Sequence, residues 1–235
     1  MRKSSEVQIS KTADGSDTLY NPEYDQHYHS TFGAVQESQH VFIRTGLDYA
    51  LESFIPGVPG NQRNIDILEV GFGTGLNAFL TLAESEKHGL KVRYTTIEPY
   101  PLERTCWEAL NYPQLPGMQQ YAGKFARLHQ CEWDIGEQIS PYFMLRKVSS
   151  RLEDYTPGPA PFQLVFFDAF GPDAQPELWT EQIFNKLFIS LDTGGVFVTY
   201  SVKGSVVRAL RSAGFTTEKI PGPPGKRHIL RAIKI

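Results

Sequence analysis

The chain has 235 residues, of which 40% are hydrophobic and 21% charged, with a net charge of −3 and two cysteines. This composition is typical of a globular protein and excludes a disordered chain, a coiled coil and a small disulfide-stapled domain. No apolar run reaches the length of a membrane span, and Met1–Ser10 lacks the apolar segment of a signal peptide. We therefore expect a protein of the reducing cytoplasm that has no membrane partner.

The length favours one main domain with an N-terminal extension rather than two equal domains. The extension is expected to occupy residues 1–60, and the main domain residues 61–235. Within the extension, the pattern predicts a small hairpin over Val7–Tyr20. Helices are expected at Ala34–Arg44 and Leu47–Phe54.

From Ile65 onward, strand and helix patterns alternate along the chain. Continuous apolar runs are typical of parallel strands that are buried on both faces. The alternation predicts an α/β fold with a doubly wound, Rossmann-like sheet. The predicted elements are strand Ile65–Val70, helix Thr74–Lys87, strand Val92–Ile97, helix Leu102–Leu110, strands Phe143–Val148 and Gln163–Phe167, helix Glu177–Ile189, strand Val196–Tyr200, helix Ser205–Ala213 and strand His228–Ile235.

A glycine-rich segment lies where the first core strand turns into a helix, and it reads Glu69-Val70-Gly71-Phe72-Gly73-Thr74-Gly75. Alternating glycines let the backbone approach a ligand closely, and this place in an open α/β sheet is where ligands bind. A dinucleotide site would show G-x-G-x-x-G. An acid two residues before the first glycine opposes a pyrophosphate but suits the ammonium and sulfonium of S-adenosylmethionine. The segment predicts a site for that methyl donor, and a ligand-free turn is the alternative.

Two further carboxylates follow core strands. Glu98 is placed to accept hydrogen bonds from both ribose hydroxyls of the donor, although a solvated strand-end glutamate is the alternative. Asp168 emerges from an apolar strand at the same edge. Methyl transfer needs a neutral amine aligned with the methyl–sulfur bond, so we predict that Asp168 touches donor and amine and helps remove a proton. For Asp168, a helix-capping or turn role is the alternative. Phe170 and Pro172 are expected to contact the acceptor.

The charge is unevenly distributed along the chain. Residues 201–235 carry a net charge of +7, and the remainder carries −10. Such asymmetry is typical of phosphate binding, with a solvated helix face and strand as the alternative. Lys226 and Arg227 are the predicted RNA contacts, because they follow a stiff Pro/Gly turn. His27 and His29 lack companions at ligand spacing, so no metal is expected.

Together these motifs resemble the methyltransferase domain of the MnmC family, which modifies the wobble uridine of tRNA. The resemblance covers most of the chain, including Gly71-Phe72-Gly73-Thr74-Gly75-Leu76-Asn77, Asp168-Ala169-Phe170-Gly171-Pro172 and Pro176-Glu177-Leu178-Trp179-Thr180. It implies a class I S-adenosylmethionine-dependent enzyme with Asn77 at the donor site. It also implies conversion of 5-aminomethyl-2-thiouridine in tRNA to the 5-methylaminomethyl form. In two-domain members an FAD-dependent oxidase domain follows, so we expect separate enzymes to supply the amine here.

One position departs from the family pattern. Methyltransferases of this class usually carry an aspartate after the third core strand, where it binds the adenine amine, but here Ser149-Ser150-Arg151-Leu152 follows. Ser150, a backbone carbonyl, Glu153 or Asp154 are the alternatives for this contact.

Two other functions compete with the methyltransferase. An aminopropyltransferase of the spermidine synthase type shares the sheet and the acidic glycine turn, but the basic C-terminal segment disfavours a polycationic product. The other is a catalytically idle RNA-binding protein of the same fold. Retention of Glu69, Glu98 and Asp168 argues against it.

Overall fold

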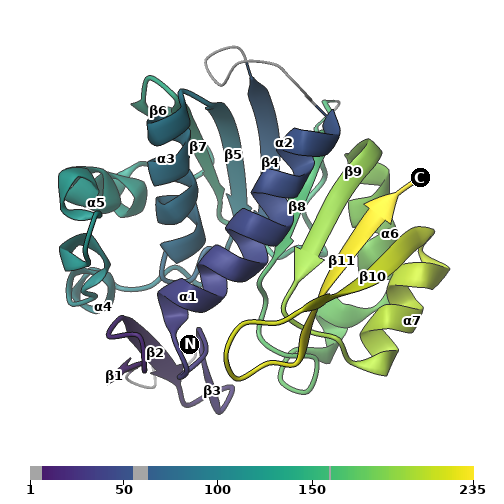
Figure 1. Cartoon of the computed structure of the whole chain (residues 1–235), viewed down its shortest axis with the longest axis horizontal. Coiled ribbons are helices and arrows are strands. Elements are labelled where there is room, and N and C mark those ends of the chain that lie inside the picture. Colours follow the sequence, from purple (N-terminus) through teal and green to yellow (C-terminus); the bar gives the residue numbers. More distant parts are fainter. Residues whose placement is uncertain (1–6, 55–62, 159) are drawn as a thin grey trace.

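The computed structural model describes residues 7–54, 63–158 and 160–235. Its centre is an eight-stranded sheet, which crosses the molecule in Figure 1. From one edge to the other the strands are β10 (Phe215–Pro221), β11 (His228–Lys234), β9 (Leu191–Thr199), β8 (Phe162–Phe167), β4 (Asn64–Val70), β5 (Lys91–Ile97), β7 (Phe143–Val148) and β6 (Gly136–Ser140).

The connections through the sheet create a ligand crevice. Strands β9, β8, β4, β5 and β7 are parallel, whereas β6 and β11 pair antiparallel with their neighbours. The chain leaves β4 for β5 on one side and later returns to β8 on the other. Such a reversal opens a crevice at the carboxyl ends of the strands. The predicted doubly wound α/β fold is confirmed.

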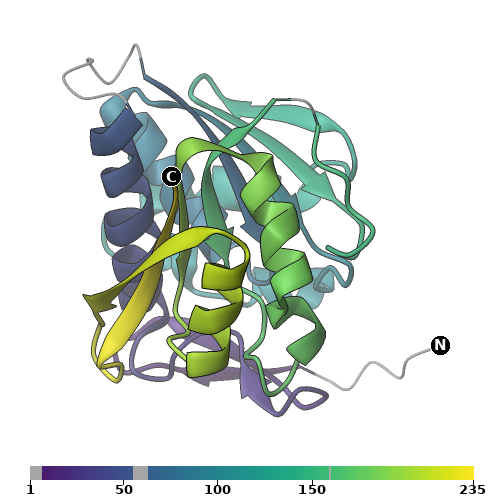
Figure 2. The same ribbon diagram turned by 90° about the vertical axis from the view of Figure 1, so that its right-hand side faces the viewer.

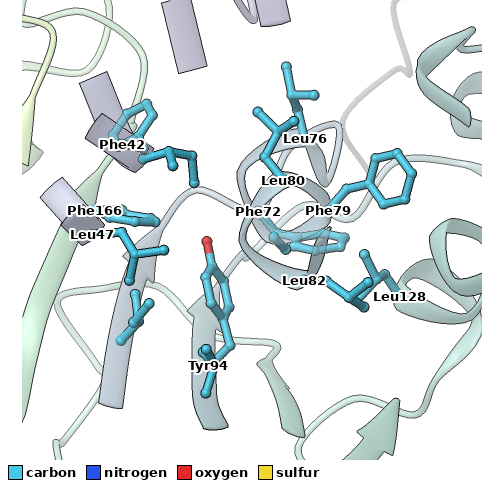
Figure 3. Packing of buried hydrophobic residues seen from close by; sticks show 14 of the residues in the cluster. Phe42, Leu47, Phe72, Leu76, Phe79, Leu80, Leu82, Tyr94, Leu128 and Phe166 are labelled. Atoms are coloured by element: carbon cyan, nitrogen blue, oxygen red, sulfur yellow. The ribbon is translucent and has the colours of Figure 1, made fainter. Parts of the chain in front are cut away.

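Helices cover both faces of the sheet (Figures 1 and 2). Successive residues of β8 point to opposite faces: Phe166 packs in one hydrophobic cluster and Phe167 in the other. Figure 3 shows the first cluster, where Phe42 and Phe166 lie near Tyr94. The first face carries α1 (Ala34–Ser38), η1 (Gln39–Asp48), α2 (Tyr49–Phe54), α3 (Leu76–His88), α4 (Arg104–Glu108) and α5 (Ala122–Gln130), and the second carries α6 (Glu181–Ser190) and α7 (Gly204–Ser212).

The two helices predicted before the first core strand are one continuous helix in the structure. It runs through α1, the π-helical η1 and α2. Gly46, in the middle, does not break it. A Cβ there would lie 3.0 Å from side-chain atoms of Phe166 and Val198, so this glycine allows the helix to pack closely on the sheet.

The predicted N-terminal hairpin is confirmed and gains a third strand. β1 (Gln8–Lys11) pairs with β2 (Asp17–Asn21), which pairs with β3 (Gln26–His27). This small sheet lies below the carboxyl ends of the parallel strands in Figure 1. The expected domain boundary near residue 60 falls outside the described residues, so that division stays a prediction.

Several other boundaries differ from the predicted ones. The helix expected over Glu177–Ile189 is a short turn, η5 (Pro176–Trp179), followed by α6, because Thr180 caps α6 by accepting a hydrogen bond from the Ile183 amide at 3.4 Å. Elements that the sequence did not predict are β3, η3 (Tyr112–Gln114), η4 (Gln119–Tyr121), α5, β6 and β10.

Within the described residues, no helix is long and apolar enough to cross a membrane.

Candidate active site

A cavity of about 1040 Å³ opens at the carboxyl ends of β4, β5 and β8. The strand ends contribute Gly71, Glu98 and Asp168 to its lining, and the small N-terminal sheet and the segment after it contribute Tyr28. A cavity of this size can hold a nucleoside-sized ligand together with part of a second substrate.

The glycine turn forms part of the cavity wall. Gly71 and Gly73 have φ angles of 93° and 48°, which favour glycine. A Cβ on Gly71 would lie 2.8 Å from the Asp168 carbonyl oxygen, and one on Gly73 would lie 3.0 Å from the Tyr28 ring. Phe72 and Gly73 line the cavity, whereas Gly75 precedes α3 and packs against His129. The backbone at Gly71 and Gly73 therefore has no room for a side chain.

Glu98 faces the cavity from the end of β5, as predicted. Its Oε2 accepts a hydrogen bond from the Gly73 amide at 3.2 Å, and its Oε1 accepts one from the Tyr100 amide at 2.8 Å. Burial raises the pKa of this carboxyl to about 7. The side chain is thus fixed beside the glycine turn, at the wall of the cavity.

Asp168 follows β8 on the other side of β4. Its amide donates to the Val70 carbonyl at 3.0 Å, and its Oδ2 accepts from Asn77 Nδ2 at 2.8 Å. The carboxyl lines the cavity, and burial raises its pKa to about 7. A group with this pKa can accept a proton near neutral pH. Asn77, predicted at the donor site, is buried behind Asp168 and orients it.

Glu69 lies one layer behind the cavity wall, away from the position predicted for it. Its side chain points from β4 into the helix-covered interior, is fully buried, and accepts from Thr96 Oγ1 at 2.7 Å. Burial raises the pKa of Glu69 to about 8. Glu69 is not among the described lining residues, so its predicted contact with the donor stays a prediction.

The loop after Asp168 is held by the N-terminal sheet. The ring of Phe170 stacks on Tyr24, with centroids 4.6 Å apart, and meets Tyr28 edge-on at 5.0 Å. The Gly171 amide donates to Gln26 Oε1 at 2.9 Å. Pro172, predicted to contact the acceptor, is not among the described residues that line the cavity. An aromatic wall built by two distant segments therefore borders the cavity.

Comparisons with known proteins agree with this geometry. A family model described as S-adenosyl-L-methionine-dependent methyltransferase matches residues 118–235. The chain belongs to this family. A crystal structure of MNMC2 from Aquifex aeolicus superposes with a TM-score of 0.78 at 28% identity, covering 98% of this chain and 71% of that one.

Curated relatives carry the name tRNA 5-methylaminomethyl-2-thiouridine biosynthesis bifunctional protein MnmC. The relative from Burkholderia mallei strain SAVP1 is 31% identical over 230 residues, which cover 91% of this chain and 33% of the relative. The relative from Magnetococcus marinus is 29% identical and covers 92% of this chain and 32% of the relative. The chain thus spans about a third of the length of the curated relatives it matches.

The residues of this methyltransferase fit its donor, S-adenosyl-L-methionine. Gly71 and Gly73 line the cavity with bare backbone, and a Cβ on either would crowd Asp168 or Tyr28. Glu98 offers carboxylate oxygens beside that backbone. Carboxylates near the turn also suit the positive charge of a sulfonium.

The segment after β7 carries the candidates for the adenine contact. Ser150 Oγ donates to the Arg151 carbonyl at 3.0 Å and is not among the described lining residues. Arg151, Leu152 and Glu153 do line the cavity, and Arg151 pairs with Glu153 at 2.9 Å. Glu153 and the backbone of this segment therefore lie at the cavity, whereas Ser150 does not line it, and the group that contacts adenine stays a prediction.

A lysine that the sequence analysis did not consider holds this segment. Lys186 Nζ, from α6, donates to the carbonyl oxygens of Leu152, Glu153 and Tyr155 at 3.1, 2.5 and 3.1 Å. An ammonium has three donors, so this set satisfies all of them. No local sequence signal marks Lys186, because its partners lie more than thirty residues earlier in the chain.

His29 connects the N-terminal segment to the glycine turn. Its Nε2 lies 2.7 Å from Thr74 Oγ1, and burial lowers its pKa to about 4, so the ring is neutral at physiological pH. Among the described residues, no group of three or more His, Cys, Asp or Glu side chains could hold a metal ion.

Lys226 and Arg227, the predicted RNA contacts, point in different directions. Lys226 lines the cavity, with its Nζ 2.5 Å from Glu37 Oε1 and 4.1 Å from the centre of the Tyr200 ring. Arg227 is exposed. The turn before them directs Lys226 inward, so its ammonium is engaged inside the protein. The role of Lys226 and Arg227 as RNA contacts stays a prediction, and the structure adds that Lys226 also lines the cavity.

Proposed function

We propose that this methyltransferase transfers a methyl group to the amine of an aminomethyl group on the wobble uridine of tRNA. The product is the 5-methylaminomethyl form of 2-thiouridine. The observation that carries the proposal is the similarity, over 91% of the chain, to proteins named for tRNA 5-methylaminomethyl-2-thiouridine biosynthesis. The position of Asp168 beside an aromatic wall supports it.

Each residue of the site has its own role in the proposed reaction. Bound S-adenosyl-L-methionine supplies an electrophilic methyl group on a sulfonium. Glu98 and the glycine turn hold the adenosine end. Asp168, oriented by Asn77, accepts one proton from the substrate ammonium. The freed amine lone pair forms the new C–N bond while the C–S bond breaks and its electrons stay on sulfur.

The acceptor base is expected to lie against the aromatic wall. Phe170 is supported on two sides by Tyr24 and Tyr28, so its exposed edge is a rigid surface for a uracil ring. The exposed Arg227 is placed for a tRNA phosphate near the cavity. Membership of the methyltransferase family argues against the aminopropyltransferase and the idle RNA-binding protein.

Nucleoside mass spectrometry of tRNA tests this proposal. We expect 5-methylaminomethyl-2-thiouridine in cells that make the protein. In cells that lack it, the aminomethyl nucleoside should accumulate. Unchanged wobble nucleosides together with loss of a methyl group elsewhere would assign a different acceptor.

A further inference from the structure

An ion pair between a buried carboxylate and a partly exposed lysine lines the cavity. Glu37, from α1, has a side chain only 8% exposed, and its Oε2 accepts a hydrogen bond from the Ser30 amide at 2.8 Å. Its Oε1 lies 2.5 Å from Lys226 Nζ. Both residues line the cavity. Taking such a pair out of water costs free energy that the pairing often fails to recover, so stability alone is a weak reason for it.

An aromatic face completes the surroundings of the ammonium. Lys226 Nζ lies 4.1 Å from the centre of the Tyr200 ring, a distance typical of a cation–π contact. The Tyr200 hydroxyl donates to the Ala169 carbonyl at 2.8 Å, which places this ring beside the residue that follows Asp168. A carboxylate and an aromatic face are thus arranged around a primary alkylammonium, next to the proposed proton acceptor.

We propose that Glu37 and Tyr200 form a binding site for a primary alkylammonium, and that Lys226 is a built-in occupant displaced by the aminomethyl cation of the substrate. The two cations belong to the same chemical class, so contacts that hold one also hold the other. The side chain of Lys226 is 28% exposed, which gives its ammonium a path to solvent. The identity of the incoming amine rests on the proposed function.

This site has a defined place in the reaction. Glu37 holds the substrate as an ammonium, and Asp168 then takes one of its protons. The charged and titratable groups around Lys226 are Glu37, Asp168, His29 and Tyr200. Since His29 is neutral, no cation opposes the carboxyl groups of Glu37 and Asp168 once the lysine has moved away, and the site then favours another cation.

Benzylammonium is a suitable probe, because it carries a primary ammonium on a CH₂ group next to an aromatic ring. We would measure its binding by calorimetry to the protein loaded with S-adenosylhomocysteine. Lys226→Met should bind it about tenfold more tightly than the parent, the scale of one recovered charged contact. Glu37→Gln should lose most of this binding, and benzyl alcohol should bind neither variant.

Matched controls separate this role from a structural one. Lys124→Met removes a lysine that pairs with Glu86 away from the cavity, and it should leave benzylammonium affinity unchanged. Should Lys226→Met fail to fold, Lys226→Gln replaces it and should shift the affinity in the same direction. Thermal unfolding of each variant confirms that a folded protein was measured.

Equal benzylammonium affinity in the parent and the Lys226 variants would overturn the proposal. So would a raised KM for tRNA with a shallower salt dependence in Lys226→Met, because that pattern belongs to a phosphate contact. The binding measurement needs no tRNA. If the expected affinities are found but aminomethyl tRNA is not methylated, the proposed function fails and the ammonium site stands.

Discussion

Glu98 joins the donor end of the cavity to the glycine turn through its bond to the Gly73 amide. Glu98→Ala removes the proposed acceptor of the ribose hydroxyls and leaves that amide without its partner. We expect donor binding to weaken by about 1.5–3 kcal/mol, the scale of a lost hydrogen bond to a charged group. Calorimetry measures it, with Glu108→Ala on exposed α4 as the control. Unchanged affinity in Glu98→Ala would remove this residue from the site.

Asp168 gives the reaction a pH dependence. Burial raises its pKa to about 7, and only the ionised carboxylate can accept the amine proton. Single-turnover methylation should therefore rise as the pH increases through about 7. In Asp168→Asn this rise should disappear and the rate should fall by at least about 100-fold, the scale of general base catalysis. If the variant kept the parental rate but lost donor affinity, Asp168 would be a donor-binding residue only.

The sequence predicts those site residues that follow a core strand directly. Glu98 and Asp168 could be found because each ends an apolar run, and the parallel sheet brings such ends to one edge. Glu37 could not be assigned a role in this way, since its partner Lys226 is far away in the chain. The sequence could not show that Ser150 Oγ donates to the Arg151 carbonyl, because the direction of a side chain in a loop depends on the local backbone.

At the scale of elements, the predictable parts are the buried ones. The strand Phe143–Val148 matches β7 residue for residue, because its apolar pattern reflects burial within the sheet. β6 and β10 are largely exposed, with polar sequences that carry no clear strand signal. The π-helical form of η1 also has no local signature, since it depends on how the helix packs against the sheet.

Helix α6 holds the segment after β7, where we propose that adenine binds, through Lys186. Lys186→Met removes three hydrogen bonds to the segment that carries Leu152 and Glu153. We expect the KM for S-adenosyl-L-methionine to rise about tenfold with little change in kcat, because the reacting groups are untouched. Lys186→Arg should recover part of the loss. A fall in thermal stability without any change in KM would show that Lys186 is only structural.

At the scale of the whole molecule, the carboxyl groups around the cavity make stability depend on pH. Burial raises the pKa of Glu69 from 4.5 to about 8, so the folded protein holds a proton that the unfolded chain releases. The resulting stability is present at low pH and lost as the pH rises toward 8. Glu69→Gln should therefore be more stable than the parent near pH 8.5, and this gain should shrink near pH 6.5.

Chemical unfolding of the two proteins across that pH window measures the difference. His29 and His129 have lowered pKa values because they are buried, and they act in the opposite sense below about pH 6.5. Between pH 6.5 and 8.5 the difference in stability therefore reports the ionisation of Glu69 alone. A constant stability difference between pH 6.5 and 8.5 would mean that Glu69 is ionised throughout.

The charge asymmetry of the chain has a different meaning in the folded molecule. Among the basic residues after Ser201, Lys226 pairs with Glu37, Arg231 pairs with Glu218, and Lys234 donates to the Leu191 carbonyl. The +7 excess is therefore only partly available to a polyanion. A count of charges along a sequence cannot reveal this, because ion pairing depends on the tertiary fold.

The most direct measurement is a reaction of the purified protein with S-adenosyl-L-methionine that carries a deuterated methyl group. The acceptor is tRNA that contains 5-aminomethyl-2-thiouridine, and the digested nucleosides are read by mass spectrometry. Our account predicts one labelled methyl group on the aminomethyl nitrogen, and none on tRNA that lacks the aminomethyl group. Absence of transfer, or a label on the base ring or a ribose, would contradict it.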